Sequence, residues 1–410
     1  MKEKSSFLGW FTRQSRVRTF SKNRMIKSQS VSDHSFQTAM IGYLLGVLHN
    51  DSVLSHNQKV SAEEIASFAV FGYVHKPLLG EITKPVKNSS DTFRAAVEAT
   101  ESFIAGKVLE TLPEHLRTDF THYLSPSPAA RETQEYRYFK MASKISYFIT
   151  AKNESLCGNK SMDQKAVRLH KEIHSFGSNN PSVKKFIVEY LPAAFLDLDD
   201  ELIAQSCGSQ FMSYVVEASN VRRWGTAAAI DIETVSAHSM QVAVFSYLYT
   251  VLHNTDVDDA WACPDPTKIL MCALFHDLIE SGINDLSGVS KHELSPLLRL
   301  EYKRLEDEVT AKLLMSLDGL QGDFESLLNL SEDNKRIVKN ADILQACLWA
   351  EFEYVVLKND DFKGIYRRLS SLVDDKCRTD PVLKQLVRVF ADDANAIVDK
   401  LFSDCGVPMA

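Results

Sequence analysis

The sequence contains few cysteines, no long apolar run and no excess of positive charge. Its seven cysteines form no Cys-x-x-Cys pair, which argues against a disulfide framework or zinc knuckle and favours a reducing cytoplasm. No apolar stretch approaches the roughly 20 residues needed to cross a bilayer, so no membrane role is expected. The formal net charge of −8 argues against a general nucleic-acid binder. The 410 residues, 45% hydrophobic and 24% charged, suffice for two or three ordinary domains.

The N-terminal segment Met1–Ser30 is basic, with eight lysines and arginines against the single acid Glu3. Such a segment alone is compatible with a cleaved leader or an RNA-binding arm. However, parts of it recur near the middle of the chain, where Val17 matches Val221 and Arg18 matches Arg222. A cleaved leader is not expected to recur inside the chain, so we interpret this segment as part of a repeated domain.

The repeat is clearest where Val31–Asn50 recurs as Val235–Asn254. The distance along the chain from Val17 to Val221 equals that from Val31 to Val235, and we call it the repeat offset. Matches at this offset, or within a few positions of it, extend over nearly the whole sequence. We therefore predict two tandem domains, residues 1–205 and 206–410.

Within each half, apolar residues recur at the spacing of helices, and no alternating pattern of comparable length indicates a strand. In the second half the predicted helices are His238–His253, Lys268–Ile279, Leu300–Leu317, Asp333–Val356 and Asp380–Phe402. The predicted fold class is all-α, with two helical bundles.

Four residues of the second half have side chains suited to metal binding: His238, His276, Asp277 and Asp342. Imidazole nitrogens and carboxylate oxygens are common ligands of manganese, cobalt, iron and zinc. Along the chain the order is a lone histidine, then an adjacent His-Asp pair, then a lone aspartate. Facing helices of a bundle can bring such residues together. The alternative is that they are ordinary buried histidines and helix caps.

This order resembles the HD-domain metal-dependent phosphohydrolase superfamily, and further motifs resemble its bacterial 5'-deoxyribonucleotidase branch. That branch has an Arg-Trp pair before the first histidine, a Thr-Val-Ser-x-His-Ser stretch, a His-Asp-x-x-Glu motif and an aspartate nine residues after the second histidine. The corresponding residues here are Arg223-Trp224, Thr234–Ser239, His276–Glu280 and Asp285.

The resemblance implies that His238, His276, Asp277 and Asp342 hold one divalent ion, which could be manganese, cobalt, magnesium, iron or zinc. Such an ion lowers the pKa of bound water from about 15.7 towards 7 and polarises a phosphoryl oxygen. The implied reaction is hydrolysis of a phosphate ester.

The resemblance also implies roles for four other residues. Arg223 would bind the phosphate through its planar guanidinium, and Trp224 would form a wall beside the sugar. Glu280 and Asp285 would handle protons or position water. On a helix, Glu280 and His276 would share one face, because they are four residues apart. The alternatives are a hydrophobic anchor for Trp224, a helix-end cap for Glu280 and a turn residue for Asp285.

The first half lacks most of these residues. The positions of Asp277, Asp342 and Arg223 are taken by Lys76, Ser143 and Thr19. A lysine ammonium among the ligands repels a divalent cation, so we predict that His34 and His75 have structural roles.

The sequence thus predicts a phosphohydrolase acting on (deoxy)nucleoside 5'-monophosphates. The second half would be catalytically active, and the first half would have lost its metal ligands. A triphosphohydrolase acting on nucleoside triphosphates and a non-catalytic nucleotide sensor are the alternatives. Because members of the resembled family form homodimers, the two halves are expected to pack as an intramolecular pseudo-dimer. Further homo-oligomerisation is left open.

Overall fold

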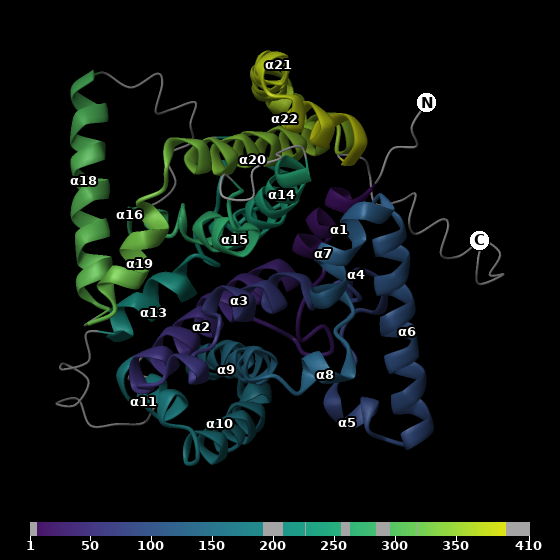
Figure 1. Ribbon diagram of the computed structural model, residues 1–410, viewed down its shortest axis with the longest axis vertical. Coiled ribbons are helices and arrows are strands. Elements are labelled where there is room, and N and C mark those ends of the chain that lie inside the picture. Colours follow the sequence, from purple (N-terminus) through teal and green to yellow (C-terminus); the bar gives the residue numbers. More distant parts are fainter. Residues whose placement is uncertain are drawn as a thin grey trace.

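The computed structural model describes residues 6–191, 208–225, 227–255, 263–283, 296–317 and 319–390 (Figure 1). These residues form helices and no β-strand, which confirms the predicted all-α class. Two isolated bridges, between Arg18 and Ser30 and between Arg222 and Thr234, are related by the repeat offset. Among the described helices, none is both long enough and apolar enough to cross a bilayer.

The described helices of the first half run from α1 to α11. They are α1 (Phe7–Arg13), α2 (Val31–Ser52), α3 (Ala62–Phe71), α4 (Lys76–Leu79), α5 (Lys84–Lys87), α6 (Asp91–Glu110), α7 (Glu114–Leu124), α8 (Pro128–Arg131), α9 (Gln134–Leu156), α10 (Asp163–Gly177) and α11 (Pro181–Glu189).

The described helices of the second half follow a similar order. They are α13 (Gly208–Glu217), α14 (Val235–Thr255), α15 (Pro266–Phe275), α16 (Glu280–Ile283), α18 (Pro296–Met315), α19 (Gln321–Leu328), α20 (Glu332–Glu351), α21 (Lys363–Thr379) and α22 (Pro381–Gln385). Two π-helical segments, Phe352–Val356 and Leu386–Phe390, continue α20 and α22.

Local capping explains where several of these helices begin. The Ser30 hydroxyl accepts from the Asp33 amide, and the Asp33 carboxylate accepts from the Ser30 amide, which forms a capping box at the start of α2. Asn180 and Asp380 cap α11 and α22 in the same way in the two halves, each before a proline in the first turn.

Helices α2 and α14 lie at the centre of the molecule. Every residue from Val31 to Leu48 and from Val235 to Leu252 is buried. The predicted helix at His238–His253 is therefore buried on all sides rather than along the single face that its spacing indicated, because each central helix packs against its own half and against the other central helix. One hydrophobic core cluster runs through both halves.

The two halves pack against each other through reciprocal contacts, as in a two-fold symmetric dimer. Tyr43 of α2 stacks edge-on against Phe324, and Tyr247 of α14 makes the same kind of contact with Phe120. Each contact is the other displaced by the repeat offset, which is the signature of an isologous interface. These reciprocal contacts confirm that the two halves pack as an intramolecular pseudo-dimer. The boundary that we predict near residue 205 lies outside the described residues.

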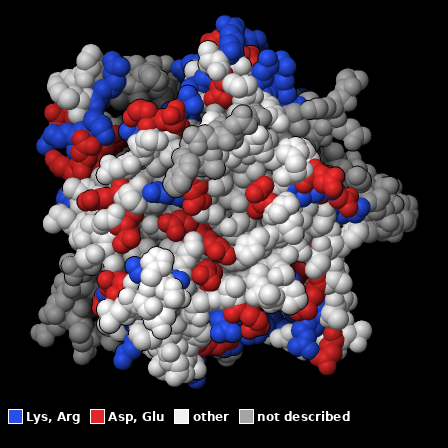
Figure 2. All heavy atoms as spheres, in the orientation of Figure 1, with Lys and Arg blue, Asp and Glu red and all other residues white. Residues whose placement is uncertain are grey.

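The surface beyond this interface carries mixed charge. On α18, acidic and basic side chains are mixed (Figure 2). Arg304 of this helix pairs with both Glu301 and Glu308. Exposed pairs of this kind keep a helix face hydrated and contribute little to stability.

Candidate metal centre

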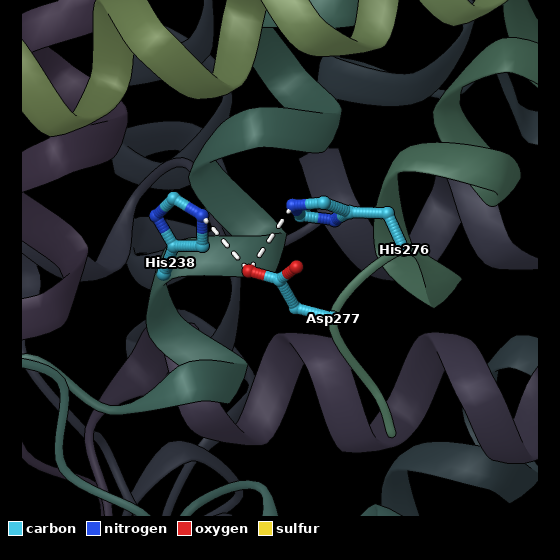
Figure 3. A group of neighbouring side chains, drawn as sticks. All are labelled: His238, His276 and Asp277. Atoms are coloured by element: carbon cyan, nitrogen blue, oxygen red, sulfur yellow. Dashed lines mark ion pairs between the residues drawn. The ribbon is translucent and has the colours of Figure 1, made fainter. Parts of the chain in front are cut away.

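Three helices of the second half bring the predicted metal ligands together. His238 lies in the first turn of α14, His276 directly follows the last residue of α15, and Asp342 lies within α20. Asp277 points its carboxylate between the two imidazoles (Figure 3). One ligand atom from each of His238, His276 and Asp277 lies within 4.8 Å of the others.

The helix that precedes His276 ends earlier than the sequence predicted. The predicted helix Lys268–Ile279 ends at Phe275, and residues 276–279 form a turn before α16 begins at Glu280. His276 and Glu280 therefore do not share a helix face. Asp277 lies in this turn, with its carboxylate beside His238.

Both histidines direct a ring nitrogen at the same oxygen atom. Nε2 of His238 lies 3.4 Å from Oδ2 of Asp277, and Nε2 of His276 lies 3.3 Å from it. Both Nε2 atoms are buried, and neither makes a hydrogen bond of normal geometry with the described residues. Buried polar atoms are rarely left unsatisfied, so their convergence on one carboxylate fits a metal cation as the missing partner.

The other ring nitrogen of each histidine is held by an acceptor. Nδ1 of His276 donates to the Ala273 carbonyl over 2.6 Å. Nδ1 of His238 lies 2.6 Å from Oε1 of Gln345, whose amide nitrogen donates to the Glu233 carboxylate. Because this orients the Gln345 oxygen towards His238, Nδ1 is the protonated nitrogen in both rings. The Nε2 lone pairs are then available to a metal.

Glu233 and Gln345 are two residues that the sequence reasoning missed. Both are buried, and Gln345 also donates to Gln241. Glu233 directly precedes the Thr234–Ser239 stretch, but no motif marks Gln345, which is one helical turn beyond Asp342 on α20.

Asp342 stands beside His238 on the other side of the cluster. Its Oδ1 lies 3.3 Å from Nε2 of His238, and its Oδ2 accepts from the Lys339 ammonium at 2.7 Å. Asp342 thus reaches one of the two histidines, while the tightest grouping consists of His238, His276 and Asp277.

The electrostatics of the cluster favour positive charge. Burial and the nearby Arg223 alone would lower the pKa of His238, but the carboxylates of Asp277 and Asp342 outweigh them and raise it to about 9. Burial alone would raise the pKa of Asp277, yet His276 and His238 hold it well below its usual range. Carboxylates that favour a protonated His238 would equally attract a divalent cation.

Arg223 lies among three carboxylates at the edge of this cluster. Its Nη1 donates to Oδ2 of Asp277 over 3.0 Å and lies 4.0 Å from the Glu280 carboxylate. Its Nε lies 3.3 Å from Glu233. Arg223 and Glu280 are thus both neighbours of the candidate metal site.

Trp224 is buried, with 7% of its surface exposed. It packs in a small cluster with Trp349, Ala350 and Phe362, and its indole nitrogen donates to Glu233. These contacts correspond to the hydrophobic anchor that was the alternative for this residue, and its role beside a sugar stays a prediction. Asp285 lies outside the described residues.

In the first half, hydrogen bonds hold the side chain of His34, which corresponds to His238. His34 places Nδ1 2.9 Å from the Ser146 hydroxyl and Nε2 3.4 Å from the Ser143 hydroxyl. Its ring stacks on Tyr147 with 4.0 Å between the ring centroids. Burial, with the charges of Lys76 and Lys140, lowers its pKa to about 3. Both nitrogens of His34 thus have hydrogen-bond partners, whereas at His238 only Nδ1 has one among the described residues.

Comparison with known proteins identifies the family. The sequence profile described as 5'-deoxynucleotidase YfbR-like matches residues 6–194 and, a second time, residues 210–393. The chain belongs to the YfbR-like 5'-deoxynucleotidase family. The two matches confirm the resemblance and the tandem arrangement, because each half matches the family by itself.

Several members of the YfbR-like family are half as long as this chain. A 5'-deoxynucleotidase of Photobacterium profundum is 27% identical over 197 residues, which cover 47% of this chain and 98% of that protein. Those of Pasteurella multocida and Yersinia pseudotuberculosis are each 28% identical and cover 47% and 48% of this chain, with 97% and 98% of their own lengths. A solved HD-domain phosphohydrolase of Listeria innocua is 18% identical, with a TM-score of 0.40, and the match covers 50% of this chain and 95% of that one.

Proposed function

We propose that the second half hydrolyses (deoxy)nucleoside 5'-monophosphates to the nucleoside and orthophosphate with the help of one divalent metal ion. His238, His276 and Asp277 would hold the ion, with Asp342 as a fourth ligand. The observation that carries the proposal is the convergence of two buried Nε2 atoms on Oδ2 of Asp277 in a YfbR-like 5'-deoxynucleotidase. When bound, such an ion polarises a phosphoryl oxygen and makes an attacking water more acidic.

The remaining steps are assigned to side chains around that site. Gln345 and the Ala273 carbonyl keep the two imidazoles in one tautomer and one orientation. Arg223 is the phosphate-binding residue, since its fork of N–H donors matches two phosphate oxygens and balances the negative charge that the ester brings.

Glu280 is the proposed proton acceptor for the attacking water. Its side chain is 8% exposed, and one carboxylate oxygen lies 4.0 Å from Nη1 of Arg223. A carboxylate here is next to the bound phosphate and outside the tight ligand group, as a general base requires. Asp285 remains a candidate for the same task.

Phosphate release from a panel of deoxy- and ribonucleoside mono- and triphosphates tests this function, with manganese, cobalt or magnesium added in turn. Orthophosphate from monophosphates is the expected product. Tripolyphosphate from triphosphates would instead make the protein a triphosphohydrolase. Failure of the folded, metal-loaded protein to hydrolyse any of these esters would overturn the proposal.

Two matched variants locate the reaction in the second half. His238→Gln removes a proposed ligand, and His34→Gln makes the same change at the equivalent position of the first half. We expect His238→Gln to lower phosphate release and metal affinity about 100-fold, in line with loss of a metal ligand. His34→Gln should retain both. Equal losses in the two variants would contradict this assignment.

A further inference from the structure

A large cavity lies in the first half, at the position that corresponds to the metal site of the second. Its volume is about 490 Å³, which is within the range of about 300–1,000 Å³ typical of small-molecule sites. Its lining includes His75, Lys76 and Ser143, the counterparts of His276, Asp277 and Asp342. The first half, which lacks the metal-binding residues, therefore still has a pocket at this position.

This cavity is unsuited to a metal ion. The imidazole of His34 is satisfied on both nitrogens, and the Ser143 hydroxyl accepts from the Tyr73 hydroxyl over 2.7 Å. The Lys76 ammonium brings positive charge to the position that Asp277 holds in the other half. The lysine ammonium thus already places a positive charge where a metal cation would lie, and it would repel such a cation.

The lining of the cavity is strongly basic. Eight lysine or arginine side chains line it against four glutamates. Three of the cations have a nearby glutamate. Lys87 pairs with Glu101 at 3.0 Å, and Lys144 and Arg168 lie 3.1 Å and 3.9 Å from Glu172. The surplus of positive charge inside a concave site attracts and concentrates anions.

Lys76 and Lys140 are two lining cations without a close carboxylate. No carboxylate of the described residues lies within 4.0 Å of either ammonium. Desolvation by the surrounding protein atoms lowers the pKa of Lys140 to about 8 and also lowers the pKa of Lys76, against the opposing attraction of Glu101. Two ammonium groups that line one cavity without an ion pair attract an anion into it.

Aromatic side chains form the rest of the wall. Tyr136 and Tyr147 line the cavity, and both are only half-buried. Phe20 also lines it, with the Lys165 ammonium 3.8 Å from its ring centroid. Flat apolar rings beside paired cations suit a ligand that joins a phosphate to an aromatic base.

The left-handed backbone at Phe20 supports a retained role. Phe20 has a φ of 53°, and its counterpart Trp224 has a φ of 62°. This conformation is unfavourable for a non-glycine residue and tends to persist where a site requires it. The first half has kept it although the metal ligands are gone.

We propose that the cavity of the first half binds a nucleoside monophosphate without a metal ion and without hydrolysing it. Lys76 and Lys140 hold the phosphate, and the tyrosine-rich wall holds the base. The site is separate from the proposed hydrolytic centre and does not depend on the second half being active.

Binding is measured on the full chain in EDTA by titration calorimetry and equilibrium dialysis. The probes are the four common deoxynucleoside 5'-monophosphates, the matching deoxynucleosides and inorganic phosphate. We expect at least one monophosphate to bind with one molecule per chain, and at least about tenfold more tightly than its nucleoside or phosphate alone, because each part of the ligand has its own contacts.

Three variants assign the bound nucleotide to one half. Lys140→Met and Lys76→Met keep most of the side-chain volume and remove the charge, and each should weaken binding about tenfold or more. Arg223→Ala disables the proposed phosphate contact of the second half and should leave the EDTA-resistant binding intact. Thermal unfolding establishes that each variant is folded, and Lys140 is the safer position because its side chain is exposed to the cavity.

The outcomes separate this proposal from the proposed function. Loss of binding in Arg223→Ala with retention in both lysine variants would place the nucleotide in the second half and overturn the inference. Absence of binding in EDTA, or equal affinity for phosphate alone, would also overturn it. Hydrolysis is scored independently, through phosphate release by wild type and His238→Gln.

Discussion

Tyr43 and Tyr247 make equivalent hydrogen bonds between the two halves, one from the first half to the second and one from the second to the first. The Tyr247 hydroxyl donates to the Asp119 carbonyl over 3.1 Å, and the Tyr43 hydroxyl donates to the Asp323 carbonyl over 3.5 Å. The two donors are related by the repeat offset, and so are the two acceptors. A pair of contacts related in this way identifies the interface as that of a two-fold dimer within one chain.

Removing the Tyr247 side chain should destabilise both halves together. Its ring contacts Phe71, Phe120 and Tyr123 of the first half, so we expect Tyr247→Ala to lower the free energy of unfolding by about 3–5 kcal/mol. Tyr247→Phe keeps the ring and should cost only about 1 kcal/mol. Urea unfolding followed by circular dichroism measures both. Two separate transitions, with only one shifted, would show that the halves unfold independently.

A first-half residue should influence the second-half site. One carboxylate oxygen of Asp33 accepts from the hydroxyls of Thr234 and Ser236, at the start of the helix that carries His238. We expect Asp33→Ala to lower the rate of phosphate release several-fold, because this helix start loses its fixed partner. Ser30→Ala disrupts the capping box of α2 and leaves those two hydroxyl contacts in place. Similar effects of the two variants on the rate, at equal folded fraction, would argue against this coupling.

The orientation of His238 should depend on Gln345. In Gln345→Leu the acceptor for Nδ1 is lost, and we expect the affinity for manganese to fall by about 10- to 100-fold, as for other partners of metal-binding histidines. Ser146→Ala makes the corresponding change beside His34 and should leave manganese affinity unchanged. Titration of phosphate release against manganese concentration measures both variants. An unchanged titration curve for Gln345→Leu would refute the role of this residue.

Acidification should destabilise the protein partly through His34. Its pKa is lowered to about 3 by burial in the folded state and is about 6.5 in the unfolded chain. The unfolded chain therefore binds the proton first, and stability is lost as pH falls from about 6.5 towards 3, by about 2 kcal/mol at pH 5. His34→Gln cannot bind this proton. Its unfolding free energy should fall less steeply between pH 7 and 5 than that of the wild type, and parallel slopes would contradict the prediction.

The sequence predicted the helices and the duplication well because both depend on patterns that local physics enforces. Apolar periodicity predicted the central helices, and Asp380, the predicted start of the last helix, is the cap residue of α22. The spacing did not predict that α14 is buried on every side, since that depends on contacts with the other half.

The sequence predicted those residues of the candidate site that belong to recognisable motifs. His238, His276 and Asp277 lie together, but the turn at residues 276–279 was not foreseen, because the apolar pattern of α15 continues into it. Glu233 and Gln345 carry no recognisable spacing, and only the folded structure brings them to His238 and Arg223. Long-range hydrogen bonds of this kind leave no trace in a single sequence.

The covalent link between the halves also changes what mutation can do. In a homodimer made from one coding unit, a lysine at the position of Asp277 would appear in both sites and remove both at once. In this chain the two positions are inherited separately, so Lys76 could arise while Asp277 was kept. Within one chain, one copy can therefore lose its metal ligands while the other keeps them.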